Sequence, residues 1–384
     1  MKKIYIKTKT ITNALYLYVI YNSLIILLYN LGWSYLLPKL SFKLLFFLFA
    51  TIIIAWFFGY LLNKSKFLPK YKIINLTHNT DFVFFILILL IIIEMVHNRG
   101  VPLLMLLKGM PYNYRDFGIK TLHVFILTFI AFYTIYLFHL FISTKKNKIL
   151  IEFLILLAYP ILIINRGDLM MTLFGIMIVF LLSIKRVSFK KVVILLIFII
   201  ISLFIFGVLG NIRMHKNYTS LFYPTKSFQE SHIPSEFLWP YMYIVSPLGN
   251  LEDTTKKDNY IYSLKGFIFA SLIPNAISKH FNYKTNKIKK IIFYLVVGTM
   301  YSSAYANLGW VGMIFMFFYL IAFIFIYLIL LRRNNPYSVT GYAILLTIIV
   351  FNAFSNMIVF SGLSFQLVYP LLLGFLNKYK FKLI

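Results

Sequence analysis

The chain has 384 residues, of which 61% are hydrophobic, and its mean hydropathy is +0.85. A soluble core of this size does not need so many apolar residues, so the composition indicates an integral membrane protein. Most of the net charge of +28 comes from lysines that flank apolar segments, and we therefore expect no nucleic-acid partner. The sequence contains no cysteine, which excludes disulfide and thiol chemistry.

Ten apolar segments follow one another along the chain, and their lengths suit helices that cross a hydrocarbon core of about 30 Å. They are apolar on every side, whereas strands of a membrane β-barrel alternate in polarity. We predict an all-α polytopic integral membrane protein with about ten transmembrane helices. The predicted spans are residues 11–31, 44–62, 81–99, 120–143, 149–165, 169–184, 192–211, 307–331, 338–359 and 362–377.

Lysines and arginines cluster in every second connection, which the positive-inside rule assigns to the cytoplasm. The basic N-terminus leads into a first segment that is too long for a signal peptide and lacks a nearby small-residue cleavage site. The later basic clusters lie in residues 63–80, 145–148, 185–191, 332–333 and 378–382. Both termini are therefore expected in the cytoplasm.

One connection, residues 212–306, forms a long outer loop in this topology. Its segment 266–278 is apolar but too short to cross, which favours an interfacial or re-entrant helix. In the alternative topology, residues 259–278 cross, 279–290 lie inside, and the chain has 12 helices. The predicted organisation is thus a membrane bundle over 1–211, the outer loop over 212–306, and the C-terminal membrane helices over 307–384.

Several ionisable residues lie at the outer ends of predicted spans, where they are candidates for function. They are Glu94, His97, Arg99, Arg166, Asp168, Arg213 and His215. The chain has 31 lysines and only 7 arginines, so lysine supplies the ordinary positive charges. Because the planar guanidinium binds phosphate in a bidentate way, the outer arginines Arg99, Arg166 and Arg213 are predicted to bind an anionic group.

Each of these residues also has a structural explanation. Arg166 would reach the membrane interface, Asp168 would cap the sixth span, and Glu94 would pair with Arg99 or His97. Away from the outer ends, Glu152 is expected to pair with Lys148 four residues earlier. His123 and His139, each alone on an apolar helix, are expected to be packing residues.

Several kinds of chemistry have no motif in this sequence. It contains no Walker A or dinucleotide-binding fingerprint, no Asp-x-Asp and no His-Glu-x-x-His. An enzyme built on this chain is therefore expected to work without metal or cofactor, through charge stabilisation and a general base.

The outer loop supplies acids, histidines and many aromatic residues. Besides Glu94, we select Glu236 and His232 as candidate catalytic groups. The candidates for glycan binding are His215, Glu252, Asn250 and Tyr243. The aromatic residues would either stack on sugar rings or form an interfacial belt, and the sequence does not separate these roles.

Three short stretches resemble a known family. They are Asn165-Arg166-Gly167 in an outer hairpin, Gly210-Asn211-Ile212-Arg213 at the start of the long loop, and residues 298–312, which run from Gly298-Thr299-Met300-Tyr301 to Trp310-Val311-Gly312. With this layout of helices and one long outer loop, the chain resembles the bacterial Wzy-type polymerases of O-antigen and capsule repeat units.

The resemblance implies a glycosyltransferase with a GT-C-like fold in the bacterial cytoplasmic (inner) membrane. Its donor would be a growing glycan on undecaprenyl pyrophosphate, its acceptor a lipid-linked repeat unit, and its partner a chain-length regulator. Arg166 and Arg213 would hold the pyrophosphate, and Glu94 or a loop acid would orient or deprotonate the acceptor. An O-antigen ligase, a flippase or transporter, and a membrane acyltransferase remain alternatives.

Overall fold

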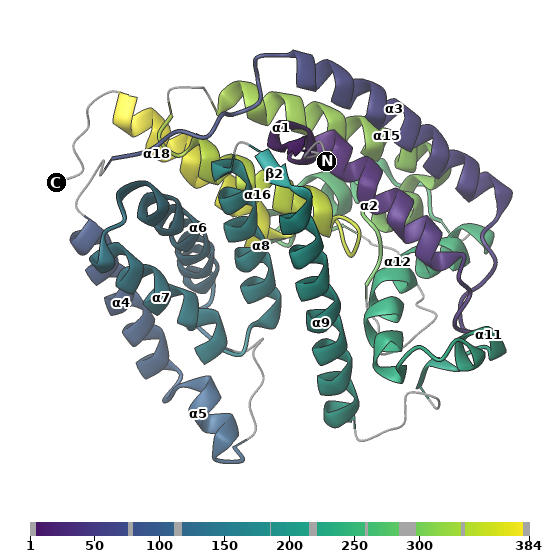
Figure 1. Ribbon diagram of the computed structural model, residues 1–384, viewed down its shortest axis with the longest axis horizontal. Helices are drawn as coiled ribbons and strands as arrows, with labels where there is room; N and C mark the ends of the chain where they lie inside the picture. The colour runs from purple at the N-terminus through teal and green to yellow at the C-terminus, as the bar shows by residue number, and fades with distance from the viewer. Residues whose placement is uncertain are drawn as a thin grey trace. The chain divides into compact units, whose positions relative to one another are not determined.

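The structure is a computed structural model that describes residues 5–75, 80–110, 117–184, 186–214, 221–257, 260–283, 297–331 and 335–378. Helices account for nearly all of its regular structure (Figure 1). One short antiparallel ribbon pairs β1 (Tyr5–Lys7) with β2 (Arg186–Ser188). The chain is therefore an α-helical protein, as predicted.

The chain forms two compact units, each assembled from segments that are far apart in the sequence. Unit 1 comprises Met1–Lys64, Lys185–Ala322 and Ile349–Val359. Unit 2 comprises Ser65–Ile184, Phe323–Ile348 and Phe360–Ile384. The predicted division into membrane bundle, outer loop and C-terminal helices concerns position in the membrane and stays a prediction.

Unit 1 contains the first two apolar helices and the segments of the predicted outer loop. Its helical elements are α1 (Thr8–Ile11), α2 (Ala14–Tyr29), α3 (Phe42–Lys64), α9 (Phe189–Met214), α11 (Lys226–Glu230), the 3₁₀ turn η2 (Ser235–Phe237), α12 (Leu238–Lys256), α13 (Leu264–Phe267), the π-helical turn η3 (Ile268–Leu272), α14 (Asn275–Ser278) and the first part of α15 (Tyr301–Leu330).

Unit 2 contains the third to sixth predicted spans and most of the C-terminal helices. Its elements are α4 (Thr80–His97), α5 (Pro102–Leu107), α6 (Leu122–Thr144), α7 (Asn147–Leu162), α8 (Arg166–Ser183), the end of α15, most of α16 (Ser338–Phe351), α17 (Ser361–Ser364), the 3₁₀ turn η4 (Phe365–Leu367) and α18 (Val368–Lys378).

Each of the ten predicted spans overlaps a helix of the structure. Within the described residues, five helical stretches are long and apolar enough to cross a membrane. They are Phe42–Lys64, Thr80–Leu107, Leu122–Thr144, Arg166–Ser183 and Tyr301–Leu330, and the shorter apolar helices are Ala14–Tyr29 and Ser338–Phe351. The total number of crossings therefore stays a prediction.

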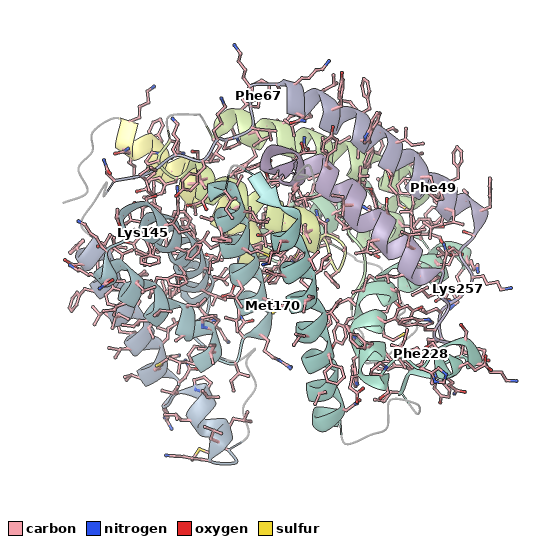
Figure 2. All side chains as sticks on the ribbon, in the orientation of Figure 1. Phe49, Phe67, Lys145, Met170, Phe228 and Lys257 are labelled. Atoms are coloured by element: carbon pink, nitrogen blue, oxygen red, sulfur yellow. The ribbon has the colours of Figure 1, made fainter. Side chains whose placement is uncertain are left out.

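Helix α3 shows why these segments suit lipid. Its large residues Phe42, Phe46, Phe49, Ile53 and Trp56 are 51–83% exposed and recur every three or four positions. They form one apolar stripe along the helix, from which Phe49 projects outward (Figure 2). Such a stripe is unfavourable in water but is compatible with the hydrocarbon of a bilayer.

The opposite face of α3 packs on α2. Asn13 caps α2, because its Oδ1 accepts hydrogen bonds from the backbone N–H groups of Leu15 and Tyr16, at 3.0 and 3.3 Å. The Asn13 side-chain amide also donates to the carbonyl oxygen of Gly59 at 2.9 Å. A Cβ at Gly59 would lie 2.6 Å from the Tyr16 ring, so glycine allows the two helices to approach closely here.

The connection after α2 pairs with the segment that precedes α11. The backbone N–H of Tyr35 donates to the carbonyl of Tyr223 at 3.0 Å, and that of Thr225 donates to the carbonyl of Trp33 at 3.0 Å. Ser34 and Pro224 form the bridge between them. These contacts join two connections that the predicted topology places on the same side of the membrane.

Candidate functional site

A buried carboxylate joins three helices of unit 2. Glu94 of α4 has no exposed surface. Its Oε1 and Oε2 lie 2.9 and 3.1 Å from Nδ1 of His123, on α6. Oε2 also accepts a hydrogen bond of 2.7 Å from the hydroxyl of Tyr159, on α7. We call Glu94, His123 and Tyr159 the Glu94 cluster.

The Glu94 cluster lies at one end of its helices. Glu94 and Tyr159 are each three residues before the end of their helix, and His123 is the second residue of α6. Their contacts therefore bring together the C-terminal ends of α4 and α7 and the N-terminal end of α6. Since α8 begins four residues after α7 ends, its N-terminus lies at this end as well.

A second polar group marks the opposite end of α4 and α7. Lys148 forms an ion pair with Asp81, and the hydroxyl of Thr80 donates to Oε1 of Glu152 at 3.5 Å. Lys148 still interacts electrostatically with Glu152, as predicted, but its close ion pair is with Asp81 on α4. Glu94 lies 13 residues beyond Asp81, about 20 Å along the helix axis. The Glu94 cluster is thus at the end away from the basic connection at residues 145–148.

His123 is held from several sides. Its ring makes an edge contact with Phe117, with centroids 5.5 Å apart. Gly118, at φ +91°, lies so close that a Cβ there would be 2.4 Å from the ring. The side chain remains 19% exposed. Within the described part of the chain, Nε2 has no hydrogen-bond partner.

The prediction that His123 is only a packing residue was wrong. Its partner Glu94 is 29 residues away, and neither the apolar stretch around His123 nor that around Tyr159 carries a signal for this contact. His139 does behave as predicted. It is buried, its Nε2 lies 3.0 Å from the carbonyl oxygen of Lys72, and its ring packs against Tyr71.

Two of the predicted arginines lie at the same end of unit 2 as the Glu94 cluster. Arg99 follows α4 in a left-handed conformation, with φ +56°, and Arg166 is the first residue of α8. Both are exposed, and no ion pair joins either one to a carboxylate in the described ranges. Glu94 thus pairs with neither Arg99 nor His97, so that structural explanation was wrong.

The arrangement predicted for the third arginine is not tested. Arg213 lies near the end of α9 in unit 1, but its side chain is outside what the structure describes, and so is the whole of His215. The prediction that three arginines share one outer surface therefore stays a prediction.

Asp168 does not cap α8, contrary to expectation. The cap is Asn165, whose Oδ1 accepts from the backbone N–H of Asp168 at 3.2 Å. Asp168 is instead buried, and its Oδ1 has no hydrogen-bond partner among the described residues. Asparagine three positions before an acid is a sequence signal for this cap, and it favours Asn165 at least as strongly as Asp168.

In unit 1, two predicted glycan-binding residues take part in packing. Glu252 of α12 is fully buried, accepts a hydrogen bond of 3.1 Å from the Ser41 hydroxyl, and lies 3.3 Å from Nζ of Lys256. Asn250 is also buried and donates its amide to the carbonyl of Val297 at 2.7 Å. These contacts link α12 to two neighbouring segments, and their role in glycan binding stays untested.

The remaining predicted loop residues are more accessible. His232 is exposed in a turn with φ +55°, and Glu236 is half-buried in η2. Neither side chain has a hydrogen bond or an ion pair to the rest of the described chain. Tyr243 is half-buried, with its ring 6.5 Å from that of Trp239.

Several aromatic residues of the loop pack against Trp33, which lies in the connection after α2. Trp33 contacts the rings of Phe228 and Tyr241 at 5.1 and 4.8 Å, and its backbone N–H donates to the Tyr241 hydroxyl at 3.1 Å. Burial raises the pKa of Tyr241, which keeps this hydroxyl neutral. The indole N–H of Trp239 donates to Oδ1 of Asn211 at 2.7 Å. These aromatic side chains thus pack against one another and stabilise the folded loop.

The structure places no group of three or more histidine or acidic side chains together as a metal site in the ranges it describes. Metal independence itself stays a prediction.

No protein-family model matches this chain, and neither a curated protein nor a solved structure matches it. The geometry of the Glu94 cluster and its neighbouring arginines is therefore the basis for assigning a function.

Proposed function

We propose that this protein polymerises oligosaccharide repeat units linked to undecaprenyl pyrophosphate. The product would be a surface polysaccharide such as O-antigen or capsule, formed on the outer face of the bacterial cytoplasmic membrane. The proposal includes a GT-C-like arrangement of about ten transmembrane helices, with both termini in the cytoplasm. The donor carries the growing glycan, and the acceptor is one lipid-linked repeat unit.

One observation supports this proposal most directly. Arg99 and Arg166 are exposed without a carboxylate partner in the described structure, at the end of unit 2 that holds the Glu94 cluster. An unpaired guanidinium binds phosphate oxygens through two parallel hydrogen bonds. A buried carboxylate–imidazole pair provides a means to accept a proton. Transfer of a glycan from a pyrophosphate needs both properties.

The acceptor hydroxyl, the donor and the arginines have separate roles in the reaction. The acceptor hydroxyl oxygen forms a bond to the anomeric carbon of the donor, and the bond from that carbon to the pyrophosphate oxygen breaks. The electron pair leaves with undecaprenyl pyrophosphate. Arg99, Arg166 and Arg213 would stabilise the negative charge that develops on this leaving group.

The described residues support ten crossings better than 12. The alternative topology needs a crossing over residues 259–278, but this region is divided into α13, η3 and α14, with a break at Ile273 and Pro274. Reporter fusions after Ser188 and after Tyr241 should report the cytoplasm and the exterior, respectively. The same side for both would overturn the topology.

Arginine-to-lysine substitutions test the proposed function. Arg99→Lys, Arg166→Lys and Arg213→Lys keep the charge but lose the bidentate geometry. Hydrogen bonds to charged groups contribute about 1.5–3 kcal/mol, and about 1.4 kcal/mol is a tenfold change in rate. We therefore expect each variant to reduce polymer formation by roughly ten- to hundredfold.

The assay is the length of the glycan ladder on a gel, from a deletion strain that carries each variant. Arg186→Lys, in the predicted cytoplasmic connection, is the matched control and should form full-length ladders. Full-length ladders from the three outer variants at normal membrane abundance would contradict the proposal. Transfer of a finished glycan to lipid A, without chain growth, would identify a ligase instead.

A further inference from the structure

We propose that His123 is the general base of this site and that Glu94 and Tyr159 are its positioning residues. The inference rests on the proposed glycosyl transfer and names the group that takes the proton of the acceptor hydroxyl. It assigns to His123 a role that the sequence suggested for Glu94.

The contacts of Glu94 leave it poorly placed to touch a substrate. Both of its oxygens lie within hydrogen-bond distance of His123, Oε2 also accepts from Tyr159, and the side chain has no exposed surface. His123 differs in both respects, since its side chain is 19% exposed and its Nε2 has no partner in the described structure. Of these two groups, His123 is the one that a sugar hydroxyl can reach.

The carboxylate also determines which ring nitrogen can act as a base. A carboxylate accepts a hydrogen bond, so it favours the imidazole tautomer with the proton on Nδ1. Nε2 then carries the free lone pair. Once Nε2 has taken a proton, the negative charge of Glu94 stabilises the resulting imidazolium.

The surroundings of the ring restrict its movement. Phe117 packs against its edge, and the close approach of Gly118 leaves no space for the ring to move toward that side. The Tyr159 hydroxyl holds the carboxylate in turn. A base that is oriented in this way is already positioned for proton transfer before the substrate reacts.

The proposed step is balanced in atoms and charge. The acceptor hydroxyl proton moves to Nε2 of His123 as the acceptor oxygen bonds to the anomeric carbon of the donor. The anomeric carbon–oxygen bond to the pyrophosphate breaks, and the leaving group departs with the electron pair. His123 then returns its proton to water on the outer side.

The first experiment needs no variant and no substrate. Diethyl pyrocarbonate acylates unprotonated imidazole nitrogens, and mass spectrometry of the full-length protein in membranes measures the extent at each histidine. We expect His123 to react faster than His139, whose Nε2 lies 3.0 Å from the Lys72 carbonyl and whose side chain is buried. Equal or slower reaction at His123 would overturn the assignment of a free Nε2.

The second experiment measures glycosyl transfer by the purified protein on a synthetic lipid-linked repeat unit. General-base catalysis contributes about 10²- to 10⁴-fold, so His123→Ala should lower kcat by at least a hundredfold. Added imidazole should restore part of this activity, because it can occupy the space that the ring leaves. His280→Ala is the control, since His280 is exposed in unit 1 and belongs to no proposed site, and it should keep wild-type activity.

Glu94→Gln tests the positioning role. The amide retains the shape of the side chain but cannot stabilise an imidazolium, so kcat should fall while KM stays near the wild-type value. His123→Asn serves in place of His123→Ala if the smaller residue prevents folding. Wild-type kcat in a His123 variant would overturn the inference and leave the polymerase intact. Absence of transfer by the wild-type protein would instead overturn the proposed function.

Discussion

Tyr159→Phe removes a single hydroxyl from the Glu94 cluster. The resulting decrease in the free energy of unfolding distinguishes a hydrogen bond to a charged acceptor from one to a neutral acceptor. The Tyr159 hydroxyl is 2.7 Å from Oε2 of Glu94, and both side chains are buried. A neutral hydrogen bond between membrane helices contributes about 0.6 kcal/mol on average. A bond to a charged acceptor contributes about 1.5–3 kcal/mol. Because the acceptor is a carboxylate, we expect the free energy of unfolding to fall by about 1.5–3 kcal/mol.

A double-mutant cycle isolates this pair. The free energy of unfolding is measured by SDS titration in mixed micelles for the wild type, Tyr159→Phe, Glu94→Gln and the double variant. Tyr369→Phe is the matched control, because its hydroxyl bonds to neutral groups in the same unit, the Thr128 hydroxyl at 2.9 Å and the Phe125 carbonyl at 3.3 Å. It should lose only about 0.6 kcal/mol. A coupling energy of the Glu94–Tyr159 pair no larger than that value would show that Tyr159 does not hold a carboxylate.

Two further substitutions in unit 2 follow from its geometry. Gly118→Ala would place a Cβ 2.4 Å from the ring of His123 at φ +91°. It should therefore lower the free energy of unfolding by more than the roughly 1–3 kcal/mol that backbone strain alone costs. Gly109→Ala, at φ +72° with open space around it, is the control and should lower the free energy of unfolding by the backbone strain only, in the same titration. Asp168→Asn removes a buried carboxyl that has no partner for its Oδ1 in the described residues, and it also removes the interaction of that carboxyl with the α8 N-terminus. We expect it to raise the free energy of unfolding by about 1 kcal/mol, and a decrease would show that the carboxylate has a stabilising partner.

Hydrophobicity was sufficient to locate the long apolar helices, although it did not indicate α12 (Leu238–Lys256) within the predicted outer loop. Predicted spans such as 44–62 and 120–143 overlap α3 (Phe42–Lys64) and α6 (Leu122–Thr144) within two residues at each end. The signal is strong because a helix that crosses lipid must be apolar along its whole length. Segment 266–278 was expected to form an interfacial or re-entrant helix, and the structure divides it among the end of α13, η3 and α14. Pro274 accounts for the break before α14, because proline disfavours a helical conformation of the preceding residue.

The site was harder to predict than the fold. Glu94 was found because a carboxylate within an apolar helix is costly and therefore conspicuous. Its partners His123 and Tyr159 are 29 and 65 positions away, on helices whose patterns do not indicate which faces meet. The error for Asp168 was local, since Asn165 three residues earlier caps α8, but the error for Lys148 also has a long-range origin. Lys148 was assigned to Glu152 because it is near in sequence, whereas Asp81 on α4 is near in space.

The interleaved composition of the two units has a consequence for biosynthesis. The chain passes from one unit to the other after residues 64, 184, 322, 348 and 359. Unit 1 therefore lacks a part until Ile349–Val359 leaves the ribosome, when nearly all of the protein has already been translated. Helices that are inserted early therefore remain in the bilayer without the packing partners that are translated last. A nascent chain arrested before this segment would consequently expose incomplete units to membrane proteases, even though most of its helices had already been inserted.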